Sequence, residues 1–309
     1  MKIYTKNYMA EKIKNYCLYG FGLVVLILNK VKHLFFQYDH PRPIPAAKIK
    51  DNIAYDRSVV LSYEVELKKY CGEDFSLAGK NILEIGPGPD LGNALLFLDQ
   101  GAASYTAVDR FNLSVVNDEF YKEILEYSFD KERLQKVVNE IKSSLVRGKK
   151  NISLPEFKYL NFPAEDLAKN LGEQKFDLIL SWATLEHLDS IDKFFSATAQ
   201  VLAPDGTLCH LIDFKTHTGL VARFDPLNIY RFSDRIYNFL KFAGAPSRKL
   251  LSDYLLALRS AGFSDLEIVN REKIIDFKIK KIKPYLARAF QDRGLEDLST
   301  MTAIILAKK

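Results

Sequence analysis

Short apolar runs and amphipathic stretches alternate along most of this chain. The runs are rich in branched side chains, which is typical of buried parallel strands. The stretches between them repeat apolar residues every three or four positions, which predicts helices. Strands that alternate with helices predict an α/β fold with a Rossmann-like, doubly wound sheet. We expect seven strands, the last two forming an antiparallel pair, at residues 81–85, 104–109, 157–162, 176–181, 207–213, 266–275 and 301–308.

The first 50 residues break this alternation. They hold nine Lys or Arg against two acidic residues, whereas the remaining 259 residues carry a net charge of −2. The apolar run 17–28, followed by lysines, is shorter than the roughly 20 residues that span a bilayer. Three interpretations stay open: a helix in the plane of an anionic membrane surface, a helix that caps the main domain, and a transmembrane span with snorkelling lysines. The proline-rich segment 39–45 predicts a boundary between a helical appendage (1–45) and the main domain (46–309).

Composition excludes several classes of protein. Hydrophobic content of 48% and charged content of 27% are ordinary for a globular protein. Cys17, Cys71 and Cys209 form no CxxC pair, so we expect neither a zinc site nor a disulfide framework, and we expect a cytoplasmic location. A main domain with almost no net charge is a poor nucleic-acid binder, so nucleic acid is not an expected partner.

A glycine-rich turn follows the first strand and opens a helix, in the segment NILEIGPGPDLG at residues 81–92. No lysine or hydroxyl residue completes a phosphate loop, and the third glycine comes one position late for a dinucleotide fingerprint. Glu84, two residues before Gly86, would repel a pyrophosphate but favour a cationic ligand. The segment resembles motif I, E-x-G-x-G, of class I S-adenosylmethionine (SAM)-dependent methyltransferases. The resemblance implies a SAM site at Glu84, Gly86, Pro87 and Gly88.

Asp109 ends the second strand, 23 residues beyond Gly86. A nucleotide-binding fold places a carboxylate here for the ribose hydroxyls, although Asp109 is also a plausible helix cap or turn residue. Phe111 could lie against the adenine ring. Arg110 lies between Asp109 and Phe111 in the sequence. We therefore include Asp109, Arg110 and Phe111 among the expected SAM-binding residues.

Three later segments also resemble this methyltransferase family. Residues 163–167, PAEDL, are similar to its short acidic turn facing adenine, which implies contacts from Ala164 and Glu165. Residues 181–188, SWATLEHL, are similar to the S-x-x-x-L-E-H version of motif IV and implicate Ser181 and Trp182, although Trp182 could instead pack in the core. An N-P-P-Y or D-P-P-Y motif is absent, which argues against amide and exocyclic-amine methylation. Residues 203–206, APDG, are similar to the family's turn before the fifth strand.

Histidines near the ends of the fourth and fifth strands are candidates for a general base. We expect His217, in the loop after the fifth strand, to be the base and Asp213 to orient it or bind substrate. His187 competes for this role, whereas His210 is expected to be a strand residue satisfied by a neighbour. No cluster of metal ligands is evident, so no metal is expected.

The expected function follows from these resemblances. We expect a helical insertion at 113–150, and the family places a substrate cover after the fifth strand, here at 214–248. The protein would transfer a methyl group from SAM to a small-molecule or saccharide-type acceptor, at oxygen, by in-line displacement. Two alternatives stay open, a non-catalytic SAM-binding regulatory protein and an RNA methyltransferase. Residues 1–38 would add peripheral attachment to the inner face of the membrane.

Overall fold

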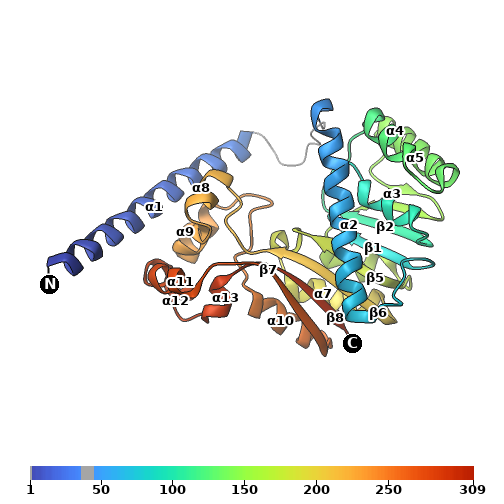
Figure 1. Cartoon of the computed structure of the whole chain (residues 1–309). Helices are drawn as coiled ribbons and strands as arrows, with labels where there is room; N and C mark the ends of the chain where they lie inside the picture. The colour runs from blue at the N-terminus through green and yellow to red at the C-terminus, as the bar shows by residue number, and fades with distance from the viewer. Residues whose placement is uncertain (1, 36–44) are drawn as a thin grey trace.

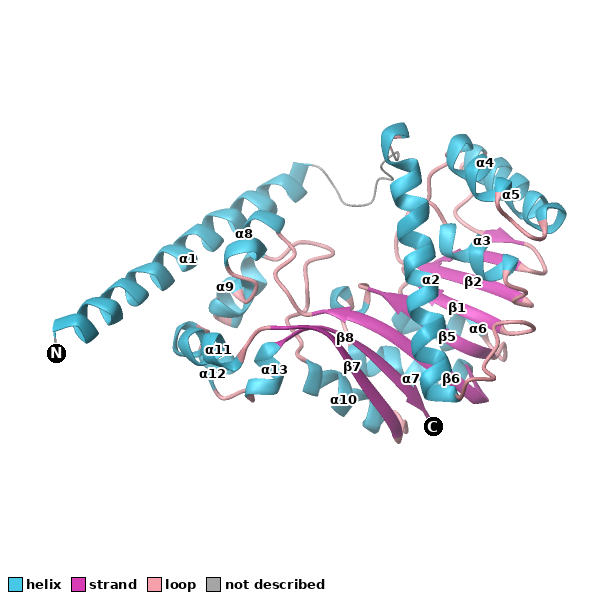
Figure 2. Ribbon diagram, viewed as in Figure 1, coloured by secondary structure: helices cyan, strands magenta, loops and turns pink. Residues whose placement is uncertain are grey.

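The computed structural model describes residues 2–35 and 45–309. Its centre is one eight-stranded sheet in the order β3-β4-β2-β1-β5-β6-β8-β7 (Figures 1 and 2). The five strands from β4 to β6 are parallel, whereas β3 and β8 run antiparallel to their neighbours. The strands are β1 (Asn81–Ile85), β2 (Ser104–Asp109), β3 (Ile152–Ser153), β4 (Phe157–Asn161), β5 (Phe176–Trp182), β6 (Leu202–Asp213), β7 (Asp265–Lys273) and β8 (Thr300–Lys308).

Helices cover both faces of the sheet, because the central strands carry apolar side chains on both sides that must be buried. In β1, Ile82 joins the core on one face, and Leu83 and Ile85 join the core on the other. The first face is covered by α2 (Ile49–Cys71), α3 (Gly92–Asp99), α4 (Asp118–Glu126) and α5 (Lys131–Val146). The second is covered by α6 (Leu167–Leu171), α7 (Ile191–Val201) and α10 (Leu251–Ser260).

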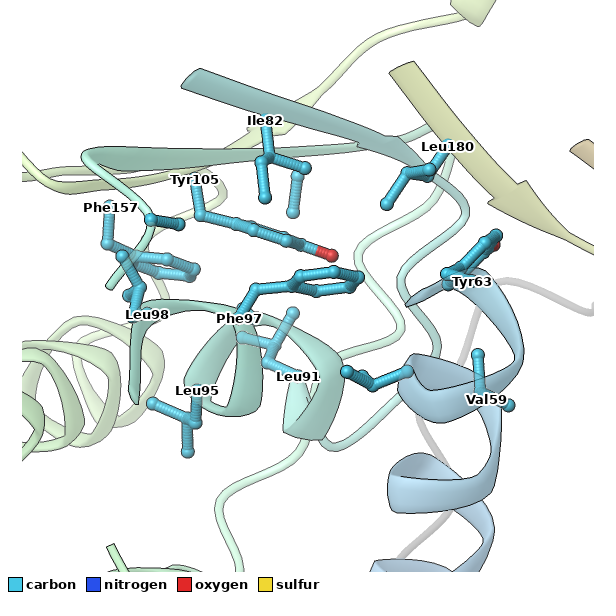
Figure 3. Close-up of a cluster of buried hydrophobic side chains, with 14 of the residues drawn as sticks. Val59, Tyr63, Ile82, Leu91, Leu95, Phe97, Leu98, Tyr105, Phe157 and Leu180 are labelled. Carbon is cyan, nitrogen blue, oxygen red and sulfur yellow. The ribbon is translucent and has the colours of Figure 1, made fainter. Parts of the chain in front are cut away.

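Aromatic side chains fill the core between α2, α3 and the sheet (Figure 3). Tyr105 from β2 stacks on Phe97 from α3, with ring centroids 5.7 Å apart. Tyr63 from α2 meets the edge of Trp182, at the end of β5, at 5.3 Å. This packing fixes α2 and α3 against the strands that end at the glycine turn.

A third, smaller core lies beside the carboxyl end of the sheet. It joins the segment after β6 to the helices between β7 and β8, and includes Leu227, Tyr230, Leu250, Phe290 and Met301. The elements involved are α8 (Gly219–Phe224), η4 (Asn228–Arg231), α9 (Asp234–Leu240), α11 (Asp276–Ile282), η5 (Lys283–Tyr285), α12 (Arg288–Gln291) and α13 (Leu295–Ser299).

The N-terminal helix α1 (Lys2–Phe35) lies against this third core and away from the sheet (Figure 1). Tyr19, Leu23 and Leu26 pack on the core from one side of the helix. The backbone carbonyl of Leu18 accepts a 3.0 Å hydrogen bond from the side chain of Asn228 in η4. The helix therefore caps the segment after β6 with one face.

The predicted fold class is confirmed, with one difference in strand number. The sheet has eight strands rather than seven, because the two-residue β3 pairs with β4. A strand this short has no readable periodicity. The predicted helical insertion at 113–150 contains α4 and α5, and the linker predicted at 39–45 lies outside the described residues except for Pro45.

Candidate active site

The glycine turn after β1 has a conformation that suits glycine. Gly86 and Gly88 have φ angles of +71° and +78°, in the left-handed region that other residues rarely adopt. A Cβ on Gly86 would lie 2.4 Å from Thr184 Oγ1, whereas a Cβ on Gly88 would meet no atom within 4 Å. The peptide N–H of Gly86 donates to Val108 O at 2.9 Å, which ties the turn to the end of β2. Gly88 therefore leaves open space beside the backbone.

A pocket of about 300 Å³ opens at the carboxyl ends of β1, β2 and β5. Ligands bind at this edge in doubly wound folds. The lining residues that the sequence also implicates are Gly86, Gly88, Asp109, Arg110, Phe111, Ala164, Glu165, Trp182 and His187.

Asp109 lies at the pocket with its carboxylate held in place. Its Oδ1 accepts a 3.0 Å hydrogen bond from the N–H of Phe111. Burial raises the pKa of Asp109 to about 6, although the peptide N–H groups of Phe111 and Arg110 oppose the rise. Across the pocket, Glu165 Oε1 accepts hydrogen bonds from the N–H groups of Asp189 and Ser190 at 2.9 and 3.2 Å. The pocket is therefore bordered by two oriented carboxylates.

Three residues expected at the SAM site do not line this pocket: Glu84, Pro87 and Ser181. Glu84 faces the opposite side of β1, where Oε1 accepts from Asn93 Nδ2 at 2.9 Å and Oε2 from Tyr105 Oη at 2.5 Å. Burial raises its pKa to about 7, and these two hydrogen bonds oppose the rise. Ser181 is buried and its Oγ lies 2.8 Å from Nδ1 of His210. His210 therefore has one neighbour as a partner, but its buried Nε2 makes no hydrogen bond.

The predicted bases meet at the His187 end of the pocket. The rings of His187 and His217 have centroids 4.8 Å apart. His217 Nε2 lies 4.0 Å from Asp213 Oδ2 and 3.7 Å from Glu186 Oε1. His187 and Glu186 belong to η3 (Leu185–His187) after β5, while Asp213 ends β6. The fold thus gathers two histidines and two acids from the ends of neighbouring strands.

A family model described as a methyltransferase domain matches residues 62–243, which is more than half of the chain. The chain belongs to this methyltransferase family. No curated protein sequence matches the chain.

Solved structures similar to the chain include two methyltransferases. One is phosphoethanolamine N-methyltransferase 2 from Haemonchus contortus, solved with phosphomonomethylethanolamine and S-adenosylhomocysteine. It has 17% identity and a TM-score of 0.46, over 79% of this chain and 51% of that chain. The other is a SAM-dependent methyltransferase from Mesorhizobium loti, with 15% identity and a TM-score of 0.42, over 76% of this chain and 93% of that chain.

SAM is the methyl donor of this methyltransferase, and the pocket has the features that such a ligand needs. Gly88 presents bare backbone to open space, and Asp109 supplies a carboxylate at the end of β2. The ring of Phe111 also lines the pocket. A glycine turn, a carboxylate and an aromatic side chain therefore lie together at one pocket at the carboxyl ends of the strands.

Burial favours the neutral form of the two clustered histidines of this methyltransferase, because it lowers the pKa of each ring. It lowers the pKa of His187 to about 4, with a smaller effect from His217. It also lowers the pKa of His217, although the charge of Asp213 opposes this. Neutral imidazoles can accept a proton or bind a cation.

Glu186 is the residue of this cluster that the sequence pattern does not mark as a candidate. It is buried, with 4% of its surface exposed, and neither carboxylate oxygen has a hydrogen-bond partner. Its only sequence signal is its position in the L-E-H triplet, which also fits an ordinary helix residue.

Proposed function

We propose that this methyltransferase transfers the methyl group of SAM to an oxygen atom of a small-molecule, saccharide-type acceptor. The observation that carries the proposal is the neutral pair His187 and His217 at one end of the pocket. An oxygen acceptor must lose its proton as it is methylated, and histidine is the commonest side chain for that task.

In this proposal SAM lies along the glycine turn with its ribose at Asp109. Phe111, Ala164 and Glu165 line the adenine end, and Trp182 lies toward the methyl group, since all four border the pocket. The protein mainly positions donor and acceptor for an in-line displacement. A new bond forms between the acceptor oxygen and the methyl carbon while the carbon–sulfur bond breaks, which leaves S-adenosylhomocysteine.

The acceptor proton goes to a histidine. We assign His217 as the base, because Asp213 lies 4.0 Å from its Nε2 and stabilises the imidazolium that forms. His187 is the competing base, because its own side chain lines the pocket. Residues 214–248 would cover the acceptor, and this cover touches the site: Gly244 lines the pocket and Ser247 N donates to Glu186 O at 2.6 Å.

Methylation of cell extract with labelled SAM tests the proposal. The labelled product should be a small molecule whose new methyl group is bound to oxygen as an ether. His217→Ala should lower turnover about 10²–10⁴-fold while SAM still binds. Tight SAM binding with no labelled product from any extract would instead identify a regulatory protein. A product labelled at nitrogen or carbon would refute oxygen transfer.

We further propose that α1 attaches the enzyme to an anionic membrane surface. One helix, Met9–Phe35, is long and apolar enough to cross a membrane by length and composition alone. Its contacts with α8, η4 and α9 favour an in-plane position, because a spanning helix would lose them. The side that faces away from the protein is apolar, with exposed Met9, Ile13, Tyr16, Phe21, Val24, Leu28, Leu34 and Phe35.

Flotation with vesicles that contain phosphatidylglycerol tests this attachment. Leu28→Asp and Leu34→Asp should weaken binding, because these side chains are 61% and 67% exposed and would enter the acyl boundary. Leu256→Asp is the matched control, since Leu256 is 66% exposed on α10. A full-length protein that stays in the soluble fraction would refute the proposal and leave α1 as a cap.

A further inference from the structure

A carboxylate and two imidazoles converge at the end of the pocket where the acceptor would bind. One ligand atom from each of Glu186, His187 and His217 lies within 4.8 Å of the others. Glu186 and His187 are adjacent in η3, and His217 reaches them from the loop after β6. Among the described residues this is the one group of three with such spacing.

The polar atoms of this group lack partners. Both carboxylate oxygens of Glu186 and Nδ1 of His187 are buried without a hydrogen bond. Nε2 of His217 lies 3.7 Å from Glu186 Oε1, which is too long for a hydrogen bond. Buried polar groups normally have partners, so three orphaned atoms on two residues of one cluster require an explanation.

A bound cation would supply the missing partners. The cluster offers two imidazoles and one carboxyl group at one end of the pocket, and each has a nitrogen or oxygen atom that can bind a metal ion. A cation held by these three side chains would give partners to buried polar atoms that otherwise have none.

We propose that Glu186, His187 and His217 form a binding site for a divalent transition-metal ion at the acceptor end of the pocket. Two imidazoles and one carboxylate suit Zn²⁺, Mn²⁺ or Fe²⁺ better than Mg²⁺ or Ca²⁺, which prefer oxygen ligands. In a tetrahedral zinc site, ligand atoms lie roughly 3.3–3.5 Å apart, given metal–ligand distances of about 2.0–2.1 Å. The 3.7 Å between Glu186 and His217 is already close to that spacing.

Three protein ligands leave coordination positions open for an acceptor hydroxyl. This part of the inference rests on the proposed oxygen methylation. A hydroxyl bound to the cation releases its proton more readily. The oxygen–methyl bond then forms as the carbon–sulfur bond breaks, and the proton leaves to water or to Asp213. With the cation bound, His187 and His217 are its ligands, so the cation takes over from His217 the task of activating the acceptor hydroxyl.

Calorimetry with Zn²⁺ on the full chain, after removal of metals by a chelator, tests the site without any acceptor. We expect one zinc ion per chain, with affinity reduced more than about 100-fold in Glu186→Gln and His217→Ala. His33→Ala, which alters a histidine on α1, is the matched control and should bind zinc as the unmodified protein does. Mg²⁺ alone should bind far more weakly.

Thermal unfolding of the metal-free proteins separates loss of a ligand from loss of the fold. Glu186→Gln should unfold at about the same temperature, because glutamine keeps the shape of a buried side chain whose oxygens make no hydrogen bond that could be lost. Zinc binding unchanged by Glu186→Gln and His217→Ala, or no zinc binding at all, would overturn the inference. Zinc binding at these residues together with a nitrogen-methylated product would retain the site and refute only the oxygen acceptor.

Discussion

SAM affinity should fall as the pH drops below about 6, because a single carboxylate becomes protonated. Burial raises the pKa of Asp109 to about 6 in the free protein. The ionised carboxylate can accept hydrogen bonds from both ribose hydroxyls, whereas the protonated form offers less acceptor capacity. Protons therefore compete with SAM, so affinity rises with pH and levels off above about pH 7.

The raised pKa of Asp109 sets the size of this effect. The apparent dissociation constant equals the intrinsic constant divided by the ionised fraction of Asp109. With a pKa of about 6, that fraction is about 0.9 at pH 7 and about 0.09 at pH 5, so affinity falls about tenfold, or about 1.4 kcal/mol. An aspartate of ordinary pKa would remain about nine-tenths ionised at pH 5 and would cause almost no loss.

Calorimetric titration with SAM from pH 5 to pH 8 measures the effect. Asp109→Ala should weaken binding at pH 7 by about 1.5–3 kcal/mol, the range for hydrogen bonds to a charged group, and should remove the pH dependence. Glu84→Gln is the control, because burial raises the pKa of Glu84 to about 7 away from the pocket. Equal affinities at pH 5 and pH 7 in the unmodified protein, or the same pH dependence in Asp109→Ala, would refute the reasoning.

Two further predictions concern the glycine turn and a buried ion pair. Gly88→Ala should still fold, at a backbone cost of about 1–2 kcal/mol, but should lose SAM affinity because its Cβ enters the open space beside the turn at φ +78°. Gly86→Val should lower the melting temperature as well, because its Cβ would collide with Thr184. A Gly86→Val variant that melts at the same temperature as the unmodified protein would contradict this. Asp225→Ala should destabilise the protein by about 3–5 kcal/mol in denaturant unfolding, because Arg231 would keep a buried charge without its 2.5 Å partner. A loss below about 1 kcal/mol would show that water reaches Arg231.

The sheet and one side of the pocket can be predicted from the sequence because their signals are local. The glycine turn depends on φ angles at Gly86 and Gly88 that few other residues adopt. The position of Asp109 follows from the end of an apolar strand. These features need only neighbouring residues, so a single sequence is enough to place them.

The opposite end of the pocket depends on contacts between distant segments. Glu186 is buried because η3 meets the loop after β6, about 30 residues later in the chain. No periodicity encodes that meeting, so the sequence does not distinguish Glu186 from a solvated helix residue. Glu84 shows a related limit. The sequence places its carboxylate close to the glycine turn, but strand alternation turns the side chain away from the pocket and toward Tyr105 and Asn93.

The contact between α1 and η4 has a consequence for how the enzyme finds its acceptor. Gly22 allows the helix to approach Asn228, whose amide bonds both to Leu18 and to Asp225 in the cover. Anything that holds α1 therefore also holds the cover beside the pocket. With α1 on a lipid surface, the pocket would keep a constant orientation to that surface, and an acceptor carried by a lipid would reach it by lateral diffusion rather than by search through the cell volume.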